Sequence, residues 1–203
     1  MLPIINLGFI TGYQNAATYG KPLLMKLSFE LTDRDLRFFR DALKQSAKAV
    51  RHAEEAEILD GIREVLADIR SNEPLPDFVE RRVPQIESMI DMLIDEEWKL
   101  PKAERERVLA VFMYFGDPED ILPDHIPVIG YLDDIIVIEL VVRELQHVSE
   151  AYEDFCRFRR AFDRKHGKSV AAALRRERLD RRRKQLHQRM QRRSASVRDK
   201  RLW

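Results

Sequence analysis

Residues 133–166 read DDIIVIELVVRELQHVSEAYEDFCRFRRAFDRKH, and this stretch decides the fold. Over 135–142 it is apolar almost all round, which is typical of a helix at the centre of a protein. Farther on, the apolar positions narrow to a stripe with steps of three or four residues, the spacing of one helix face. The stripe consists of Leu145, Val148, Tyr152, Phe155, Phe158 and Phe162. The stretch therefore predicts one long helix with a central, buried start.

Shorter helices are predicted on both sides of it. Thr32 followed by Asp35 is an N-cap signal, and Pro84 either kinks the third helix or marks its first turn. The apolar stripes before the long helix span 36–50, 58–69, 79–94 and 108–115. Strand-like alternation is not evident. The predicted fold is all-α: a compact bundle of about five or six helices, with a Pro/Asp-rich packed loop and a projecting basic C-terminal helix.

Composition agrees with one helical domain. The chain has 203 residues, of which 44% are hydrophobic and 35% charged, with only 7 Gly and 9 Pro, which excludes a fibrous repeat or a wholly disordered chain. Its single cysteine, Cys156, cannot form an internal disulfide, and no signal peptide or membrane span is evident, so we expect a cytoplasmic protein. We expect a poorly ordered arm over 1–27, a helical domain over 28–166 and a basic helix or tail over 167–203.

The charges are strongly asymmetric along the chain. From Arg157 onward there are 19 basic and 4 acidic residues, whereas the preceding part has 17 basic and 31 acidic residues. Such a basic tail binds an anionic membrane surface, nucleic acid or the protein's own acidic surface. Apart from Trp203, the segment after Gly167 has no aromatic residue for base stacking, so nucleic-acid binding would not be sequence-specific. The predicted anion-binding residues are Arg175, Arg176, Arg178, Arg181, Arg182, Arg183, Lys184, Arg189, Arg192 and Arg193.

The loop at 116–134 reads GDPEDILPDHIPVIGYLDD and is too apolar for a solvated connection. Its geometry is set by Pro118, Pro123, Pro127 and Gly130. Its carboxylates are Asp117, Asp120, Asp124, Asp133 and Asp134. In one interpretation they cap free loop amides, with Asp133 at the N-cap of the long helix. In the other they converge, with His125, on Mg²⁺, Mn²⁺ or Ca²⁺.

The motif D-P-x-D-I-L-P-D-x-I-P-x-x-G-Y-L-D-D at 117–134 closely resembles the signature of the YkvA-like family (domain of unknown function 1232). The resemblance covers roughly 108–145. It implies a small helical domain, found mainly in bacteria and often predicted to be membrane-associated, with no established reaction. Asp117 and His125 replace small or apolar residues of the family pattern, and this added polarity counts against deep membrane insertion.

These patterns predict a non-catalytic interaction or scaffold module. No phosphate-binding loop or nucleophile elbow is present, and Cys156 and the five histidines form no recognisable catalytic spacing. We expect the basic tail to face an anionic partner, with the inner surface of a membrane as the favoured one and no cofactor. Two alternatives stay open: a metal-dependent enzyme that uses the five aspartates, and non-specific nucleic-acid binding by the tail. Self-association through the apolar start of the long helix is also open.

Overall fold

The computed structural model describes residues 4–12, 23–30, 32–71, 80–115, 132–167 and 171–196. Two strands come first, followed by helices. The strands are β1 (Ile4–Gly12) and β2 (Leu23–Glu30), and the helices are α1 (Asp33–Ala49), the short 3₁₀ helix η1 (Val50–His52), α2 (Glu55–Ser71), α4 (Val83–Ile94), α5 (Lys102–Phe115), α6 (Leu132–His166) and α7 (Ala172–Ser196). Six α-helices thus lie in the described ranges, and the predicted all-α bundle is confirmed for the body of the molecule.

Three helix boundaries follow the predicted signals. Thr32 and Asp35 form a reciprocal capping box, in which each side chain accepts a hydrogen bond from the other residue's backbone N–H. Pro84 lies in the first turn of α4, where its missing N–H costs nothing, so it starts this helix and does not kink it. Gly167 ends α6 at a φ of +53°, a left-handed conformation that glycine adopts without strain.

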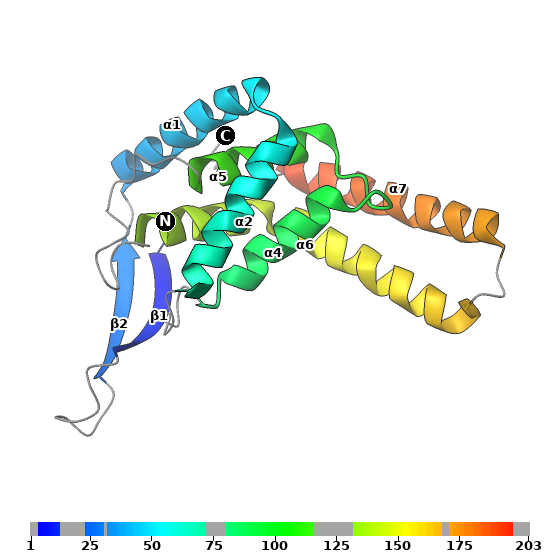
Figure 1. The fold of residues 1–203 in the computed structure, drawn as a ribbon, viewed down its shortest axis with the longest axis horizontal. Coiled ribbons are helices and arrows are strands. Elements are labelled where there is room, and N and C mark those ends of the chain that lie inside the picture. The colour runs from blue at the N-terminus through cyan, green and yellow to red at the C-terminus, as the bar shows by residue number, and fades with distance from the viewer. Residues whose placement is uncertain are drawn as a thin grey trace.

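The core is built around α5 and the first half of α6 (Figure 1). Helix α5 packs against α1, α2 and α6, and α4 packs against both α5 and α6. Residues 108–112 of α5 are all buried, as are residues 136–138 of α6. The predicted central start of the long helix is therefore confirmed. This continuous apolar burial is what holds the body together.

A two-stranded antiparallel hairpin precedes α1, and the sequence patterns had not predicted it. The register runs from Ile4 opposite Glu30 to Gly12 opposite Leu23, with an irregularity between Asn6 and Gly8. The hairpin includes much of the arm expected to be poorly ordered. Residues 25–30, MKLSFE, do alternate apolar and polar side chains, which is the strand signal that we overlooked next to the glycine-rich residues before it.

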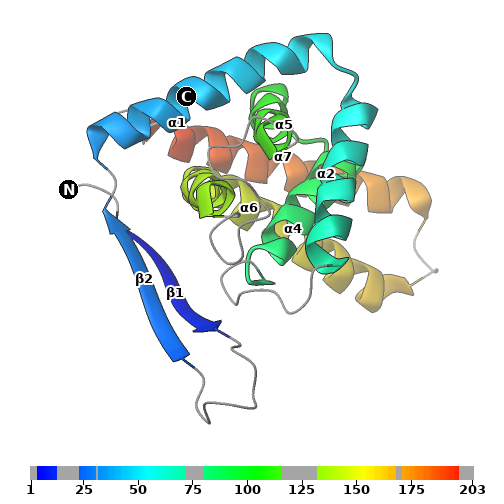
Figure 2. The same ribbon diagram turned by 60° about the vertical axis from the view of Figure 1, so that its left-hand side comes forward.

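Helices α6 and α7 form an antiparallel pair whose closed end extends away from the body (Figures 1 and 2). The basic helix thus projects from the body at this end, and along its length α7 folds back on α6. Three apolar side chains of α7, Leu179, Leu186 and Met190, are buried. They give the helix a narrow apolar face, sufficient to dock it on the acidic body that the charge asymmetry indicated.

Candidate functional site: the junction of the Asp95–Leu100 loop with α6 and α7

Asp95 organises the loop that joins α4 to α5. Its Oδ1 accepts hydrogen bonds from the backbone N–H groups of Glu97, at 2.9 Å, and Trp98, at 3.0 Å. Its backbone carbonyl accepts from Trp98 and Lys99. Lys99 has a φ of +51°, a left-handed conformation that is uncommon for a residue with a Cβ. The loop therefore keeps a defined shape and directs Glu97 and Trp98 toward α6 and α7.

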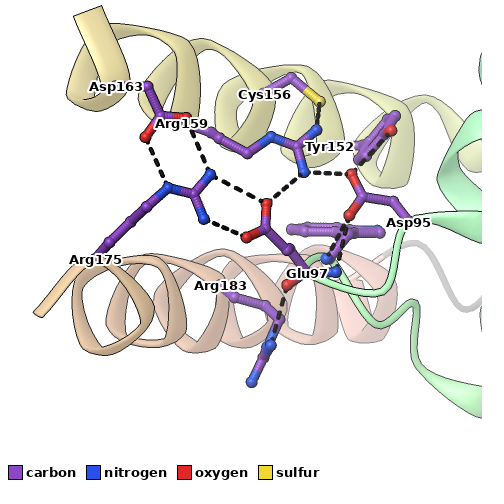
Figure 3. A network of polar contacts seen from close by, with 9 residues as sticks. Asp95, Glu97, Tyr152, Cys156, Arg159, Asp163, Arg175 and Arg183 are labelled. Atoms are coloured by element: carbon purple, nitrogen blue, oxygen red, sulfur yellow. Dashed lines mark hydrogen bonds and ion pairs between the residues drawn. The ribbon is translucent and has the colours of Figure 1, made fainter. Parts of the chain in front are cut away.

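Two carboxylates of this loop pair with arginines of both long helices (Figure 3). On the α6 side, Arg159 contacts Asp95 Oδ2 at 2.8 Å and Glu97 Oε2 at 3.0 Å. On the α7 side, Arg175 pairs with Glu97 and also with Asp163 of α6, where its Nε lies 2.7 Å from Oδ1. The network ties three chain segments together at one point.

The hydrogen bonds from Arg175 dominate the electrostatics of this network. They lower the pKa of Glu97 below its ordinary value against the opposing effect of burial, and Arg159 adds to the lowering. The pKa of Asp163 is lowered mainly by the same guanidinium. Both carboxylates are therefore ionised at neutral pH, and Arg175 is the residue that joins them.

Trp98 is fully buried beneath the network. Its ring lies 5.3 Å from that of Phe155 and 5.7 Å from that of Tyr152, both on α6, and 4.5 Å from the imidazole of His187 on α7, in an edge-to-face contact. Burial, together with the nearby charge of Arg183, lowers the pKa of His187 to about 4. At neutral pH the imidazole is uncharged, which suits its position against an indole.

At this junction each charged side chain of the network lies next to a group of opposite charge. Tyr152 donates to Asp95 Oδ2 at 3.2 Å, and burial raises the pKa of this phenol. Cys156 is half-buried with its Sγ 3.6 Å from a guanidinium nitrogen of Arg159. A cavity of about 830 Å³ lies beside the network, lined by residues that include Lys99, Arg175 and Arg183. The arrangement holds α7 in place and leaves its ion pairs within reach of solvent.

Farther along α7, further basic side chains contact the body. Arg189 pairs with Asp154 at 2.6 Å, Arg193 pairs with Glu150, and the Arg182 guanidinium lies 5.8 Å from the ring centre of Phe158. Arg183 donates to the backbone carbonyl of Glu97 at 3.0 Å. Much of the predicted anion-binding set thus already has anionic or aromatic partners within the protein.

The rest of that set faces outward. Arg181 is exposed, and its ion-pair partner among the described residues is Glu177 of its own helix. Within the residues that the structure describes, the remaining four are exposed and make no hydrogen bond or ion pair: Arg176, Arg178, Lys184 and Arg192. The same is true of Arg160, Arg164 and Lys165 near the end of α6. The α6–α7 hairpin therefore has a paired inner side and an unpaired basic outer side.

The predicted aspartate site can be located only in part. Asp117, Asp120 and Asp124 lie outside the described residues, as do His125, Pro118, Pro123, Pro127 and Gly130. Helix α6 begins at Leu132, which places Asp133 and Asp134 in its first turn, so the helix starts two residues earlier than an N-cap at Asp133 requires. Among the side chains that are described, no group of three His, Cys, Asp or Glu could hold a metal ion.

Sequence reasoning missed the junction because its partners are far apart in the chain. Pattern reasoning extends the helix of the 79–94 stripe to an end near Leu100, which places Asp95 and Glu97 inside a helix and not in a loop. The available signal was the Asp95–Glu97–Trp98 cluster just before Pro101, where the apolar stripe stops. The arginines that complete it lie 62 and 78 positions from Glu97.

The molecule is a helical bundle that carries an ion-paired helical hairpin. Residues 107–140 match the family model described as "Protein of unknown function (DUF1232)", which confirms the resemblance to the YkvA-like family. The match covers the second half of α5 and the start of α6. No curated protein and no solved structure matches the chain. None of the helices in the described part is long and apolar enough to span a membrane.

Proposed function

We propose that the protein is a non-catalytic interaction module that binds the anionic inner surface of a membrane through the outer side of the α6–α7 hairpin. The observation that carries this proposal is the unpaired basic side just described. Lys184 and Arg192 lie on the side of α7 opposite the buried Leu179, Leu186 and Met190, and the exposed Arg178 lies on its flank. These cations are therefore presented to solvent by a helix whose other face is fixed.

Charge complementarity favours a phosphate-rich surface as the partner. Each Lys or Arg near an anionic bilayer contributes about 1 kcal/mol, and salt screens the attraction within roughly a Debye length. The outer side offers little apolar surface, with Leu174 as its exposed large hydrophobic residue. The binding should therefore be peripheral, reversible and dominated by charge.

The test is co-sedimentation of the full chain with phosphatidylglycerol/phosphatidylcholine vesicles at rising NaCl concentrations. We expect binding that needs the anionic lipid and weakens with salt. The variant R178Q/K184Q/R192Q should lose about two orders of magnitude in affinity, at about 1 kcal/mol for each residue.

The matched control is R37Q/K48Q/R51Q. It removes the same number of charges from residues of α1 and η1 that are also exposed and form no ion pair within the described ranges, and it should bind like the parent. Equal binding to pure phosphatidylcholine, or equal weakening of both variants, would contradict the proposal. Tighter binding to duplex DNA than to anionic vesicles in the same buffer would favour the nucleic-acid alternative.

A further inference from the structure

Helix α7 is docked on the body by a narrow apolar face and by ion pairs on either side of it. Apart from its three buried apolar side chains, its contacts with the body are made largely by arginines, which pair with Glu97, Glu150, Asp154 and Asp163. The carboxylate side chains of these pairs range from 23% to 43% exposed. Ion pairs this open to water are individually weak and are screened by salt. A competing anion can therefore reach them.

The docked state also leaves polar groups unsatisfied. Trp98 Nε1 and His187 Nε2 are buried at the contact between the loop and α7, and neither has a hydrogen-bond partner in the described part of the chain. Water would satisfy both if α7 moved away. The 830 Å³ cavity is lined by Glu97, Arg175 and Arg183, so solvent reaches the ion pairs next to this contact. The unsatisfied polar groups and the nearby solvent both lower the free-energy cost of separating α7 from the body.

Guanidinium groups bind phosphate with the same charge-assisted, paired hydrogen bonds that they form with carboxylate. We infer that α7 is a displaceable helix: the phosphates of an anionic membrane replace the body carboxylates as partners of its arginines, and the departure of α7 uncovers Trp98. This inference rests on the proposed function and adds its regulation. Displacement releases Arg175, Arg183, Arg189 and Arg193 to join the cations that are already free, so binding and opening reinforce each other.

Trp98 is a direct reporter of this step. The chain has two tryptophans, so W203F leaves Trp98 alone. In the docked state its ring is shielded from water and in contact with His187. Anionic vesicles should shift its emission to the red and speed amide exchange in α7, while pure phosphatidylcholine vesicles should change neither. Co-sedimentation of the same samples records binding independently.

Removing the carboxylates that pair with the arginines of α7 should separate this helix from the body even without lipid. In the W203F background, E97Q/E150Q/D154N should show red-shifted emission and about tenfold faster amide exchange in α7, because each of the lost half-exposed pairs contributes a few-fold. The matched control is E64Q/E96Q/E153Q, which removes three exposed carboxylates that make no ion pair in the described structure. R189Q/R193Q cuts two pairs from the helix side and leaves the loop intact, so it should also loosen α7.

The outcomes separate the two proposals. Red-shifted emission in the pair-cutting variants and in the vesicle-bound parent supports displacement. Vesicle binding with unchanged Trp98 emission overturns displacement and leaves the proposed function standing. Emission in both pair-cutting variants that matches the control shows that the pairs do not hold α7, and this also overturns the inference. Absence of vesicle binding overturns the proposed function together with the trigger inferred here.

Discussion

Helix α6 passes through two regions of opposite character. Its start lies in the DUF1232 segment, and within and just after that segment Val137 and Val141 are fully buried against an apolar core. Its second half faces α7, and there Glu150, Asp154 and Asp163 bind arginines at the surface. Apolar burial is indifferent to salt and to competing ions, whereas half-exposed ion pairs are sensitive to both. The first part of α6 thus makes contacts that salt hardly changes, whereas its second part makes contacts that salt and competing anions weaken.

The largest effect is expected in the apolar region. Phe112 of α5 is 1% exposed, so Phe112→Ala leaves a cavity in the core and should lower the free energy of unfolding by about 3–5 kcal/mol. The loss should be the same at low and high salt, as measured by urea unfolding. The exposed Leu174→Ala serves as control and should change stability by less than about 0.5 kcal/mol. A strong salt dependence of the Phe112→Ala loss would contradict the contrast between the two regions.

The next effect concerns pH and the contact between His187 and Trp98. The pKa of His187 is about 4 in the folded protein and 6.5 in its ordinary state. Between these values the unfolded chain binds a proton that the folded protein does not, so the free energy of unfolding falls as pH drops from about 6.5 to about 4. The loss is at most about 3 kcal/mol.

The difference in pH dependence between the parent and His187→Gln measures this contribution. His147 is also buried, and its pKa is lowered by that burial, but it is present in both proteins and its contribution cancels. Denaturant unfolding at several pH values should give a shallower slope for the variant. Equal slopes would show that the imidazole is not held neutral against Trp98.

The two regions also differ in how far the sequence predicted them. The core was predictable because burial repeats at helical spacing, as along 108–112 and 135–142, and this spacing is visible in a single chain. The ion-paired junction was not, because Glu97 and Arg175 are brought together only by the path of the whole chain. Charge asymmetry correctly indicated an acidic body and a basic helix. It could not divide the arginines into paired ones such as Arg189 and unpaired ones such as Arg192, since both look alike in the sequence.

The difference between paired and unpaired arginines of α7 gives the prediction with the smallest expected change in stability. Arg189 pairs with Asp154, whereas Arg192, three residues later on the same helix, is exposed and has no ion pair with any described residue. Arg189→Gln should lower the free energy of unfolding by about 0.5 kcal/mol at low salt, and the loss should vanish at high salt because a half-exposed pair is screened. Arg192→Gln should leave stability unchanged at both salt concentrations, although it removes the same charge from the same helix. The two substitutions have similar helix propensities, so urea unfolding at two salt concentrations isolates the ion pair. Equal losses for both variants would mean that the whole basic helix, and not its particular partners, determines how α7 is held.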